Sequence, residues 1–426
     1  MIKILKNSTE IAEFVQNISL RGGENCGAEK VALDIINDVK LRGDEAVNEL
    51  TKRFDCENLE YYEVPKNAVD KAFYEADEDF VNALKRCKVN IETYHEKQVR
   101  AGYEIRQEND VILKQRVIPL DKVGIYIPGG TAPLFSSVLM CAVPAKIAGV
   151  GEIIMATPPR SDGSPNPDTL VAAKLCGVDR VFLCGGAQAI AAMAYGTLQI
   201  PKVSKIVGPG NAYVAAAKKL LFGEIDIDMI AGPSEILIIA DDSANPRYIA
   251  ADMLSQAEHD KLASAVLITT SEEIANLTIA ELDKQLKALS RGEMAAESLK
   301  NYGAIIIQDE LEKAIEIANL IAPEHLEILT ENPFEVEEKI RNAGSVFVGE
   351  YSPEPLGDYF AGTNHVLPTN GTARFFSPLS VDDFVKKSSS IFYTNEALKS
   401  AASDIILVAE REGLTAHANS IRVRMG

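Results

Sequence analysis

The sequence contains no tryptophan, no CxxC pair among its six cysteines and no long apolar run. A chain of 426 residues buries a large core without covalent staples, so we expect reduced, mostly buried thiols rather than a disulfide framework. No segment reaches the roughly 18 apolar residues of a transmembrane helix. Residues 1–7 turn polar at once, unlike a signal peptide. Together these absences predict a cytoplasmic protein.

Basic residues are also in short supply. The chain has 43 Lys and Arg against 62 Asp and Glu, a formal net charge of −19 and a pI near 4.8. An acidic surface repels nucleic acid and anionic membranes, so we expect neither as a partner. The excess charge serves solubility and identifies no substrate.

Short apolar segments alternate with helical patterns from Val123 onward. Their nearly continuous apolar character predicts strands that are buried on both faces of parallel sheets. The expected strands are 123–127, 153–156, 180–183, 205–207, 235–240, 265–269, 304–307 and 345–348. This number favours two sheets over one. The predicted fold class is therefore α/β, with two Rossmann-like domains and small helical segments at the N-terminus and the C-terminus.

We expect four parts along the chain. They are an N-terminal arm (1–22), a main α/β domain (23–125 with 235–378), a second α/β domain (126–234) and a C-terminal segment (379–426). Long amphipathic helices are predicted at 27–53 and 66–98, and strands at 103–106 and 111–118. Residues 350–378 are rich in Pro, Gly and Thr and lack periodicity. So long an irregular stretch in a compact protein is usually functional.

Four of the five histidines lie in the last 168 residues, each near a carboxylate or an amide. Gln256 and His259 are three apart in a helical segment, so they share one face. Glu324 and His325 follow a proline at a junction. Taken singly, each has a simpler explanation as a helix-end or surface side chain. Clustered, they are the residue types that a zinc site with an adjacent general base needs.

Two further segments belong to this set. Asp358 and His365 lie in the irregular region, where Asp358 offers a hard oxygen for zinc and His365 either a ligand or a supporting group. Glu412 and His417 are five apart, and the glycine after Glu412 is expected to break the helix so that both reach one site. The alternatives are a turn-forming aspartate and a surface histidine.

Three glycine-rich junctions follow predicted strands, at 125–130, 184–188 and 207–211. Strand–glycine–helix junctions are where nucleotides dock in α/β sheets, because free amides at a helix N-terminus attract phosphate. No GxGxxG motif is present, and an ordinary turn explains any one junction. Three in succession favour a nucleotide-binding cleft.

Eight segments, in order along nearly the whole chain, resemble the histidinol dehydrogenase family. They are residues 123–130, 185–189, 208–212, 231–235, 254–259, 322–327, 362–369 and 412–417. The resemblance implies that zinc is held by Gln256, His259, Asp358 and His417, with one ion per subunit. It implies NAD contacts from Tyr126, Gln188 and Asn211, with two NAD consumed per turnover. It implies an acid–base pair of Glu324 and His325. The implied substrate contacts are Ser234, Gln256, His259, His325, Asp358, Glu412 and His417.

The same resemblance implies the reaction and the assembly. L-histidinol is expected to be oxidised to L-histidine through L-histidinal, with His325 taking the hydroxyl proton and Glu324 activating water. Zinc orients the imidazole and the amine of the substrate. The enzyme is expected to be a homodimer in which residues 379–426 complete the partner's active site. Two alternatives from other classes are a zinc hydrolase on the same ligands and a non-catalytic binding protein. Binding of NAD would distinguish the dehydrogenase from the zinc hydrolase. Turnover of substrate would distinguish it from the non-catalytic binding protein.

Overall fold

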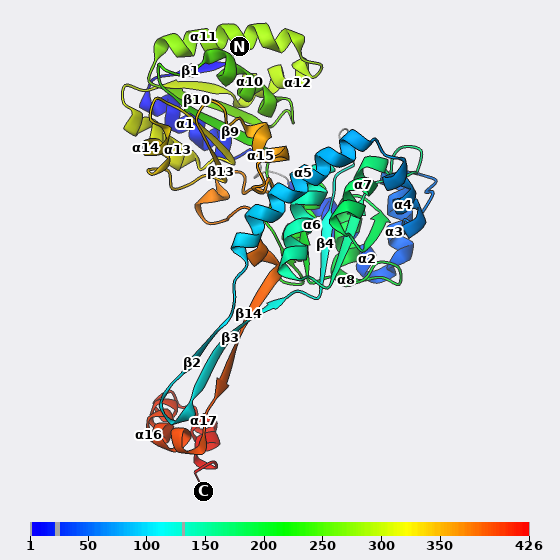
Figure 1. Ribbon diagram of the computed structural model, residues 1–426, viewed down its shortest axis with the longest axis vertical. Coiled ribbons are helices and arrows are strands. Elements are labelled where there is room, and N and C mark those ends of the chain that lie inside the picture. Colours follow the sequence, from blue (N-terminus) through cyan, green and yellow to red (C-terminus); the bar gives the residue numbers. More distant parts are fainter. Residues whose placement is uncertain (1, 22–25, 130–132, 426) are drawn as a thin grey trace. The chain divides into compact units, whose positions relative to one another are not determined.

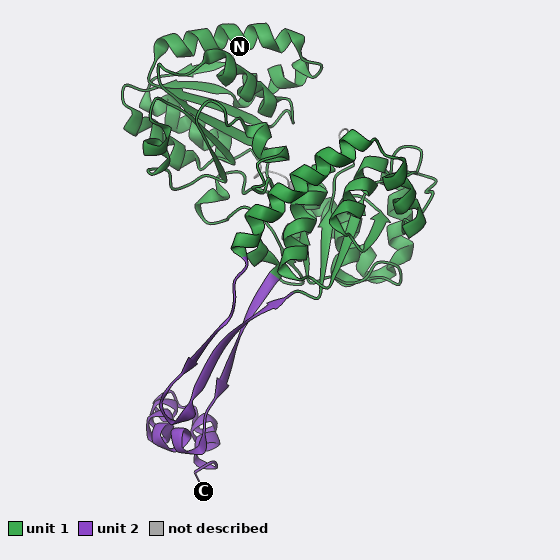
Figure 2. Cartoon of the chain, in the orientation of Figure 1, with its two compact units in different colours: residues 1–98, 120–384 green, residues 99–119, 385–426 purple. Residues whose placement is uncertain are grey.

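The computed structural model describes residues 2–21, 26–129 and 133–425 (Figure 1). The chain divides into two compact units (Figure 2). The larger unit comprises residues 1–98 and 120–384, and the smaller unit comprises residues 99–119 and 385–426. Gly130, which lies in one of the segments that resemble the family, falls outside the described residues.

The larger unit contains a six-stranded parallel sheet in the order β1-β11-β10-β9-β12-β13. Its strands are β1 (Lys3–Leu5), β9 (Glu235–Ala240), β10 (Ser264–Thr269), β11 (Ala304–Ile307), β12 (His325–Leu329) and β13 (Ser345–Val348). Helices α10 (Pro246–Ala257), α11 (Glu272–Gln285) and α12 (Gly292–Tyr302) cover one face. Helices α1 (Ser8–Ser19), α13 (Leu311–Ile321) and α14 (Pro333–Glu337) cover the other. Burial on both faces explains why most residues of the central strands are apolar.

The first residues do not form the separate arm that we expected. Strand β1 pairs with β11, and α1 buries Ile11, Phe14 and Ile18 against the sheet. The helical spacing of these apolar residues was visible in the sequence, but their packing partners lie more than about 200 residues further along the chain. This segment is an edge strand and a covering helix of the six-stranded sheet.

A second, five-stranded parallel sheet has the order β6-β5-β4-β7-β8. Its strands are β4 (Lys122–Tyr126), β5 (Glu152–Thr157), β6 (Arg180–Leu183), β7 (Lys205–Val207) and β8 (Asp226–Ile227). One face is covered by α2 (Cys26–Arg42), α3 (Asp44–Phe54), α8 (Gly186–Tyr195) and α9 (Ala212–Leu221). The other is covered by α5 (Glu78–His95), α6 (Ser136–Ala148) and α7 (Pro167–Cys176), and α4 (Lys66–Glu75) packs beside α7.

The domain boundary near residue 125 therefore lies elsewhere than expected. We grouped residues 23–125 with the later sheet, whereas helices α2–α5 pack on the five-stranded sheet and β4 is its central strand. The amphipathic pattern of these helices predicts a buried face but not which sheet it meets. The α/β class and the two parallel sheets are confirmed. In each sheet the first strand of a βαβ series is central, as in a Rossmann-like half.

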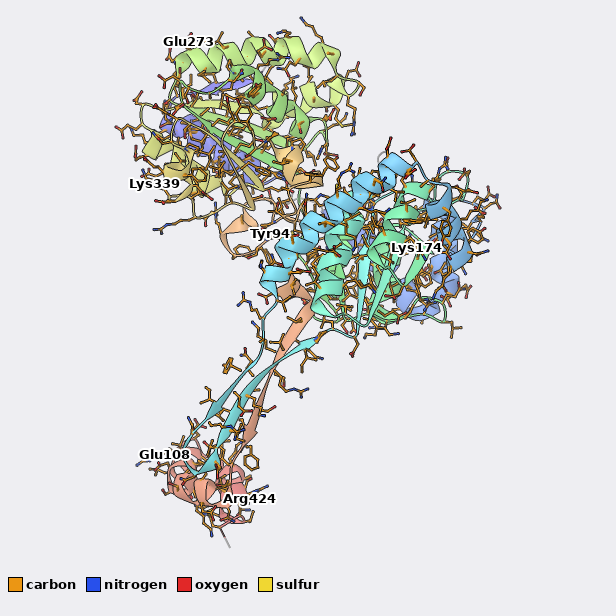
Figure 3. The ribbon with its side chains drawn as sticks, in the orientation of Figure 1. Tyr94, Glu108, Lys174, Glu273, Lys339 and Arg424 are labelled. Atoms are coloured by element: carbon orange, nitrogen blue, oxygen red, sulfur yellow. The ribbon has the colours of Figure 1, made fainter. Side chains whose placement is uncertain are left out.

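The smaller unit consists of an antiparallel ladder and two helices. Strands β14 (Val385–Phe392) and β2 (Tyr103–Arg106) pair on either side of β3 (Ile112–Pro119). Helices α16 (Asn395–Arg411) and α17 (Thr415–Arg422) follow. Figure 3 shows the side chains of the ladder standing away from its strands. The described C-terminal segment thus begins with a strand, and residues 379–384 belong to the larger unit, where Leu379 and Phe384 are buried.

The described helices include none that is both long enough and apolar enough to cross a membrane.

Candidate active site

The residues proposed for catalysis lie at the amino edge of the six-stranded sheet. Glu324 and His325 stand at the start of β12, and Ser234 immediately precedes β9. Helix α10 follows β9 and, as a crossover between parallel strands, runs back toward the edge where β9 begins. Its C-terminal end therefore brings Gln256, with His259 just beyond, back to this edge. Sequence reasoning about α/β folds favours the opposite, carboxyl edge.

His325 is a buried imidazole with one nitrogen committed and one available. Its Nδ1 lies 3.0 Å from the backbone oxygen of Glu235. A carbonyl only accepts, so Nδ1 donates and Nε2 keeps its lone pair. No described side chain or backbone group hydrogen-bonds Nε2. Burial lowers the pKa of His325 to about 4, which keeps the ring neutral near pH 7. This is the state that a general base requires.

Glu324 is held beside His325 by the start of the neighbouring strand. Its Oε2 accepts a hydrogen bond of 2.9 Å from the backbone N–H of Glu235 and lies 3.8 Å from Nδ1 of His325. Burial raises the pKa of Glu324 well above its ordinary value. The Glu235 side chain is itself buried and forms an ion pair with Arg21, which follows α1. The proposed acid–base pair is therefore fixed by backbone contacts between β9 and β12.

A short helix, α15 (Glu354–Tyr359), adds two carboxyl groups to the site. Glu354 is 1% exposed, and its Oε1 lies 4.0 Å from Nε2 of His325. His325, Glu354 and Asp358 each offer a possible metal-ligand atom, and these atoms lie within 4.8 Å of one another. Burial raises the pKa of Glu354 to about 7 and that of Asp358 to about 6. We did not select Glu354 from the sequence, although its spacing of four residues from Asp358 in an irregular region was a usable signal.

Gln256 and His259 approach the same place from α10. Gln256 is fully buried, its Oε1 has no hydrogen-bond donor among the described residues, and its Nε2 lies 3.5 Å from Nδ1 of His259. The charge of His259 influences the pKa values of His325 and Glu354, which places it near both. An amide oxygen without a donor, an exposed imidazole and a carboxylate are a donor set that suits zinc.

The two remaining residues of the expected site belong to the smaller unit. Glu412 directly follows α16, and His417 lies on α17; both side chains are exposed. Gly413, between them, has φ of +75°, so the helix ends here as the sequence predicted. Within the larger unit, α10 with Gln256 lies beside α15 with Asp358, because Oγ of Ser255 on α10 hydrogen-bonds Glu354 on α15. Glu324 and His325 lie at the start of β12, at the same edge.

His365, whose role the sequence left open, supports Asp358. Its Nδ1 lies 3.0 Å from the backbone oxygen of Asp358, and its Nε2 lies 3.1 Å from Oγ of Ser137. Both nitrogens are therefore engaged by protein groups, and burial lowers the pKa of His365 to about 4. This leaves a supporting role rather than a ligand role. The fifth histidine, His95, is buried at the end of α5 and bonds to the carbonyl of Ile91.

The residues expected to contact NAD lie at the carboxyl edge of the five-stranded sheet. Tyr126 ends β4, Gln188 lies in the first turn of α8, and Asn211 precedes α9. Strands β4 and β7 are neighbours whose connections leave in different directions along the sheet order. Such a switch point, at the carboxyl ends of the strands, is where α/β sheets bind ligands.

The amides at two of the three glycine junctions are not free, contrary to our expectation. The Tyr126 hydroxyl accepts from the N–H of Gly186 at 3.1 Å. Asp55 accepts from the N–H of Gly185 at 2.9 Å and from Nε2 of Gln188 at 3.2 Å. The side chain of Asn211 caps its own helix. The third junction runs into residues outside the described part of the chain. The sequence gave no reason to select Asp55, which binds one of the residues expected to contact NAD.

The fold and the site together define an α/β enzyme of the dehydrogenase type. One sheet presents a neutral imidazole, carboxyl groups and possible metal ligands, and the other presents a ligand-binding switch point. The family model for histidinol dehydrogenase matches residues 22–425. A histidinol dehydrogenase from Clostridium acetobutylicum is 56% identical over 426 residues, covering 100% of this chain and 99% of the relative.

Solved structures agree with the sequence matches. The crystal structure of histidinol dehydrogenase from Elizabethkingia anophelis has a TM-score of 0.90 and 38% identity, covering 100% of this chain and 98% of that one. An acetylating aldehyde dehydrogenase from Geobacillus thermoglucosidasius has a TM-score of 0.50 at 14% identity, covering 92% and 99%, and shares the fold alone. The chain belongs to the histidinol dehydrogenase family. It is accordingly an NAD-linked oxidoreductase of the last step of histidine biosynthesis.

Proposed function

We propose that this chain converts L-histidinol to L-histidine in two successive oxidations, with bound L-histidinal between them. Each turnover reduces two NAD and uses one zinc ion per subunit. The observation that carries this proposal is the buried, neutral imidazole of His325 with Nε2 unbonded beside Glu324, in a chain of this family.

Zinc is proposed to bind to Gln256, His259, Asp358 and His417. The support is chemical: the Gln256 oxygen is buried without a donor, and the Asp358 carboxylate lies among possible ligand atoms. The ion supplies a Lewis-acidic centre that orients the imidazole and amine nitrogens of the substrate. Glu354 lies close enough to offer an alternative oxygen ligand, whereas His325 is needed as the base.

The acid–base steps are assigned to Glu324 and His325. Nε2 of His325 takes the hydroxyl proton of L-histidinol while hydride passes to NAD. Glu324 then activates the water that adds to the aldehyde, before a second hydride transfer. Ser234, Gln256, His259, His325, Asp358, Glu412 and His417 are the proposed substrate contacts. Tyr126, Gln188 and Asn211 are the proposed NAD contacts.

We propose a homodimer with shared active sites because the described residues of the smaller unit form no large apolar core of their own. The apolar residues buried in it are small or few: Val111, Ala397, Ala402, Ala409 and Ala418. Large apolar side chains of the same unit are exposed instead, including Tyr103, Ile105, Ile391, Phe392, Leu407 and Val408. So many exposed apolar side chains in one small unit favour an interaction site. Residues 379–426 are proposed to complete the partner's active site.

The decisive experiment follows NADH formation from L-histidinol and NAD by the zinc-loaded protein, with and without a chelator. Two NADH per L-histidine, lost on chelation and regained with zinc, is the expected result. A folded, zinc-loaded protein that produces no NADH would contradict the proposal. Activity that survives complete removal of the metal would contradict its zinc part alone.

A further inference from the structure

Glu327 is a carboxyl group in the middle of β12, and the mechanism proposed above gives it no part. It is 0% exposed in a sheet whose neighbouring central strand, β9, is apolar beyond its first residue. Register places it opposite Ile238, on the face covered by α10. Burying a carboxyl group away from water is costly unless hydrogen bonds compensate. We therefore expect neighbouring groups to compensate for the burial of this carboxyl group.

Two helices supply these groups. Oε1 of Glu327 accepts a 2.8 Å hydrogen bond from the backbone N–H of Glu354, the first residue of α15. The carboxyl group also lies against the side chain of Asp252 on α10, and the two acidic groups affect each other's pKa. A third contact joins the two helices directly, because Oγ of Ser255 donates to Oε2 of Glu354 at 2.9 Å. Glu327 thus stands at the meeting point of β12, α10 and α15.

Each of these elements carries part of the active site. Strand β12 begins with His325, two residues before Glu327 and on the same face of the sheet. Asp252 precedes Gln256 by four residues on α10, and Glu354 precedes Asp358 by four on α15. Residues four apart in a helix are neighbours on one face. Glu327 therefore contacts each helix at a residue that lies one turn before a proposed zinc ligand.

We propose that Glu327 is a positioning residue that fixes α10 and α15 against β12, so that Gln256, Asp358 and His325 converge. It touches neither substrate nor cofactor and acts through the residues that do. The proposal rests on the zinc site and base assigned under the proposed function. Groups that orient metal ligands typically govern metal affinity by about 10- to 100-fold.

Two substitutions at Glu327 separate positioning from simple stability. Glu327→Gln keeps an oxygen for the Glu354 N–H and an N–H for Asp252. It should hold the zinc dissociation constant and kcat within about threefold of the native protein. Glu327→Leu keeps the volume but removes both contacts. It leaves the N–H of Glu354 without an acceptor, so the metal-free melting temperature should fall, as it should in any variant that breaks a comparable buried bond. Beyond that loss of stability, zinc should bind about 10-fold or more weakly.

Asp241→Ala is the matched control. Asp241 is a carboxylate at the opposite edge of the same sheet, where it accepts from the N–H of Glu331 at 2.8 Å and that of Ser243 at 2.9 Å. Its loss should lower the melting temperature without changing zinc affinity. Zinc dissociation constants from chelator competition, melting temperatures of metal-free protein, and KM and kcat for L-histidinol are the measurements.

The outcomes are distinct. If Glu327→Leu binds zinc as tightly as the native protein, the proposal is overturned. It is also overturned if Glu327→Gln loses as much zinc affinity as Glu327→Leu. If Glu327→Leu does not fold, Asp252→Ala removes one of the two contacts from a partly exposed position. It should weaken zinc binding about 10-fold, and native affinity in that variant overturns the proposal equally. Native protein that neither binds zinc nor forms NADH instead refutes the proposed function itself.

Discussion

At the scale of single residues, the bond between His325 and the backbone oxygen of Glu235 decides the chemistry. It fixes the proton on Nδ1 and leaves Nε2 to accept the proton of the substrate hydroxyl. His325→Asn should fold and bind zinc as the native protein does, but lose about 10²- to 10⁴-fold in kcat. Steady-state NADH formation and zinc content by atomic absorption check this. Undiminished turnover would show that another group is the base.

The sequence identified many of these residues, but only through their place in a family pattern. Glu324, His325, Gln256 and Asp358 lie in segments with recognisable neighbours. Glu327 and Asp55 act by accepting hydrogen bonds from backbone N–H groups far away in the chain. Nothing in local periodicity reports such a bond, because the donor is a backbone group that every sequence contains.

At the scale of elements, the turn that enters α8 is held by a residue from a distant part of the chain. Asp55, just after α3, accepts from the N–H of Gly185 and from the side chain of Gln188 through the same oxygen, Oδ2. This contact therefore also orients a residue proposed to contact NAD. The sequence predicted a strand and a helix joined by glycines. It did not predict that protein groups would accept hydrogen bonds from the amides of these glycines.

This contact gives a prediction about NAD. Asp55→Ala should raise KM for NAD by about 10-fold, the equivalent of roughly 1.4 kcal/mol, because Gln188 loses its partner. Asp55→Asn keeps an acceptor oxygen and should restore most of the affinity. Asp179→Asn, at the opposite edge of the same sheet, where Asp179 accepts from the N–H of Ile153, is the control and should leave KM for NAD unchanged. Equal KM values in Asp55→Ala and native protein would remove Asp55 from the NAD site.

At the scale of the whole molecule, buried carboxyl groups make stability depend on pH. Burial raises the pKa of Asp252 and of Glu354 to about 7. When a carboxyl group has a higher pKa in the folded state than in the unfolded state, it stabilises the fold at low pH. That contribution to the free energy of unfolding is lost as the pH rises through the folded-state pKa. His325 and His365 have lowered pKa values and act in the opposite sense, but only below about 6.5.

Between pH 6.5 and 8, the metal-free protein should therefore lose stability, by about 1 kcal/mol for each such carboxyl group. Zinc should reduce the loss, because a bound cation stabilises neighbouring carboxylates. Denaturant unfolding at several pH values, with and without zinc, measures both effects. Glu354→Gln removes one of the titrating groups and should flatten the metal-free profile. A metal-free stability that rises with pH in this window would contradict the assignment.

The largest gap between sequence and structure concerns assembly. The sequence cannot show whether an apolar face of a strand or helix is buried within the chain or exposed. Both cases give the same periodicity of apolar residues. The structure shows that Ile391 is 74% exposed and Phe392 54% exposed, and that His417 shares this smaller unit. If two chains share an active site, the unit that carries the partner-supplied ligand needs apolar surface with which to bind the partner. The exposed side chains beside His417 fit this arrangement.

Mixing two inactive variants tests that arrangement. His325→Asn disables the base and His417→Asn disables the proposed partner-supplied ligand. If His417 acts on the partner, a mixed dimer contains one site with both lesions and one with neither. After subunit exchange at equal amounts, half of the dimers are mixed, so activity should recover toward about one quarter of the native value. Each variant mixed with itself is the control. No recovery, with exchange proven by differently tagged subunits, would place His417 in the active site of its own chain.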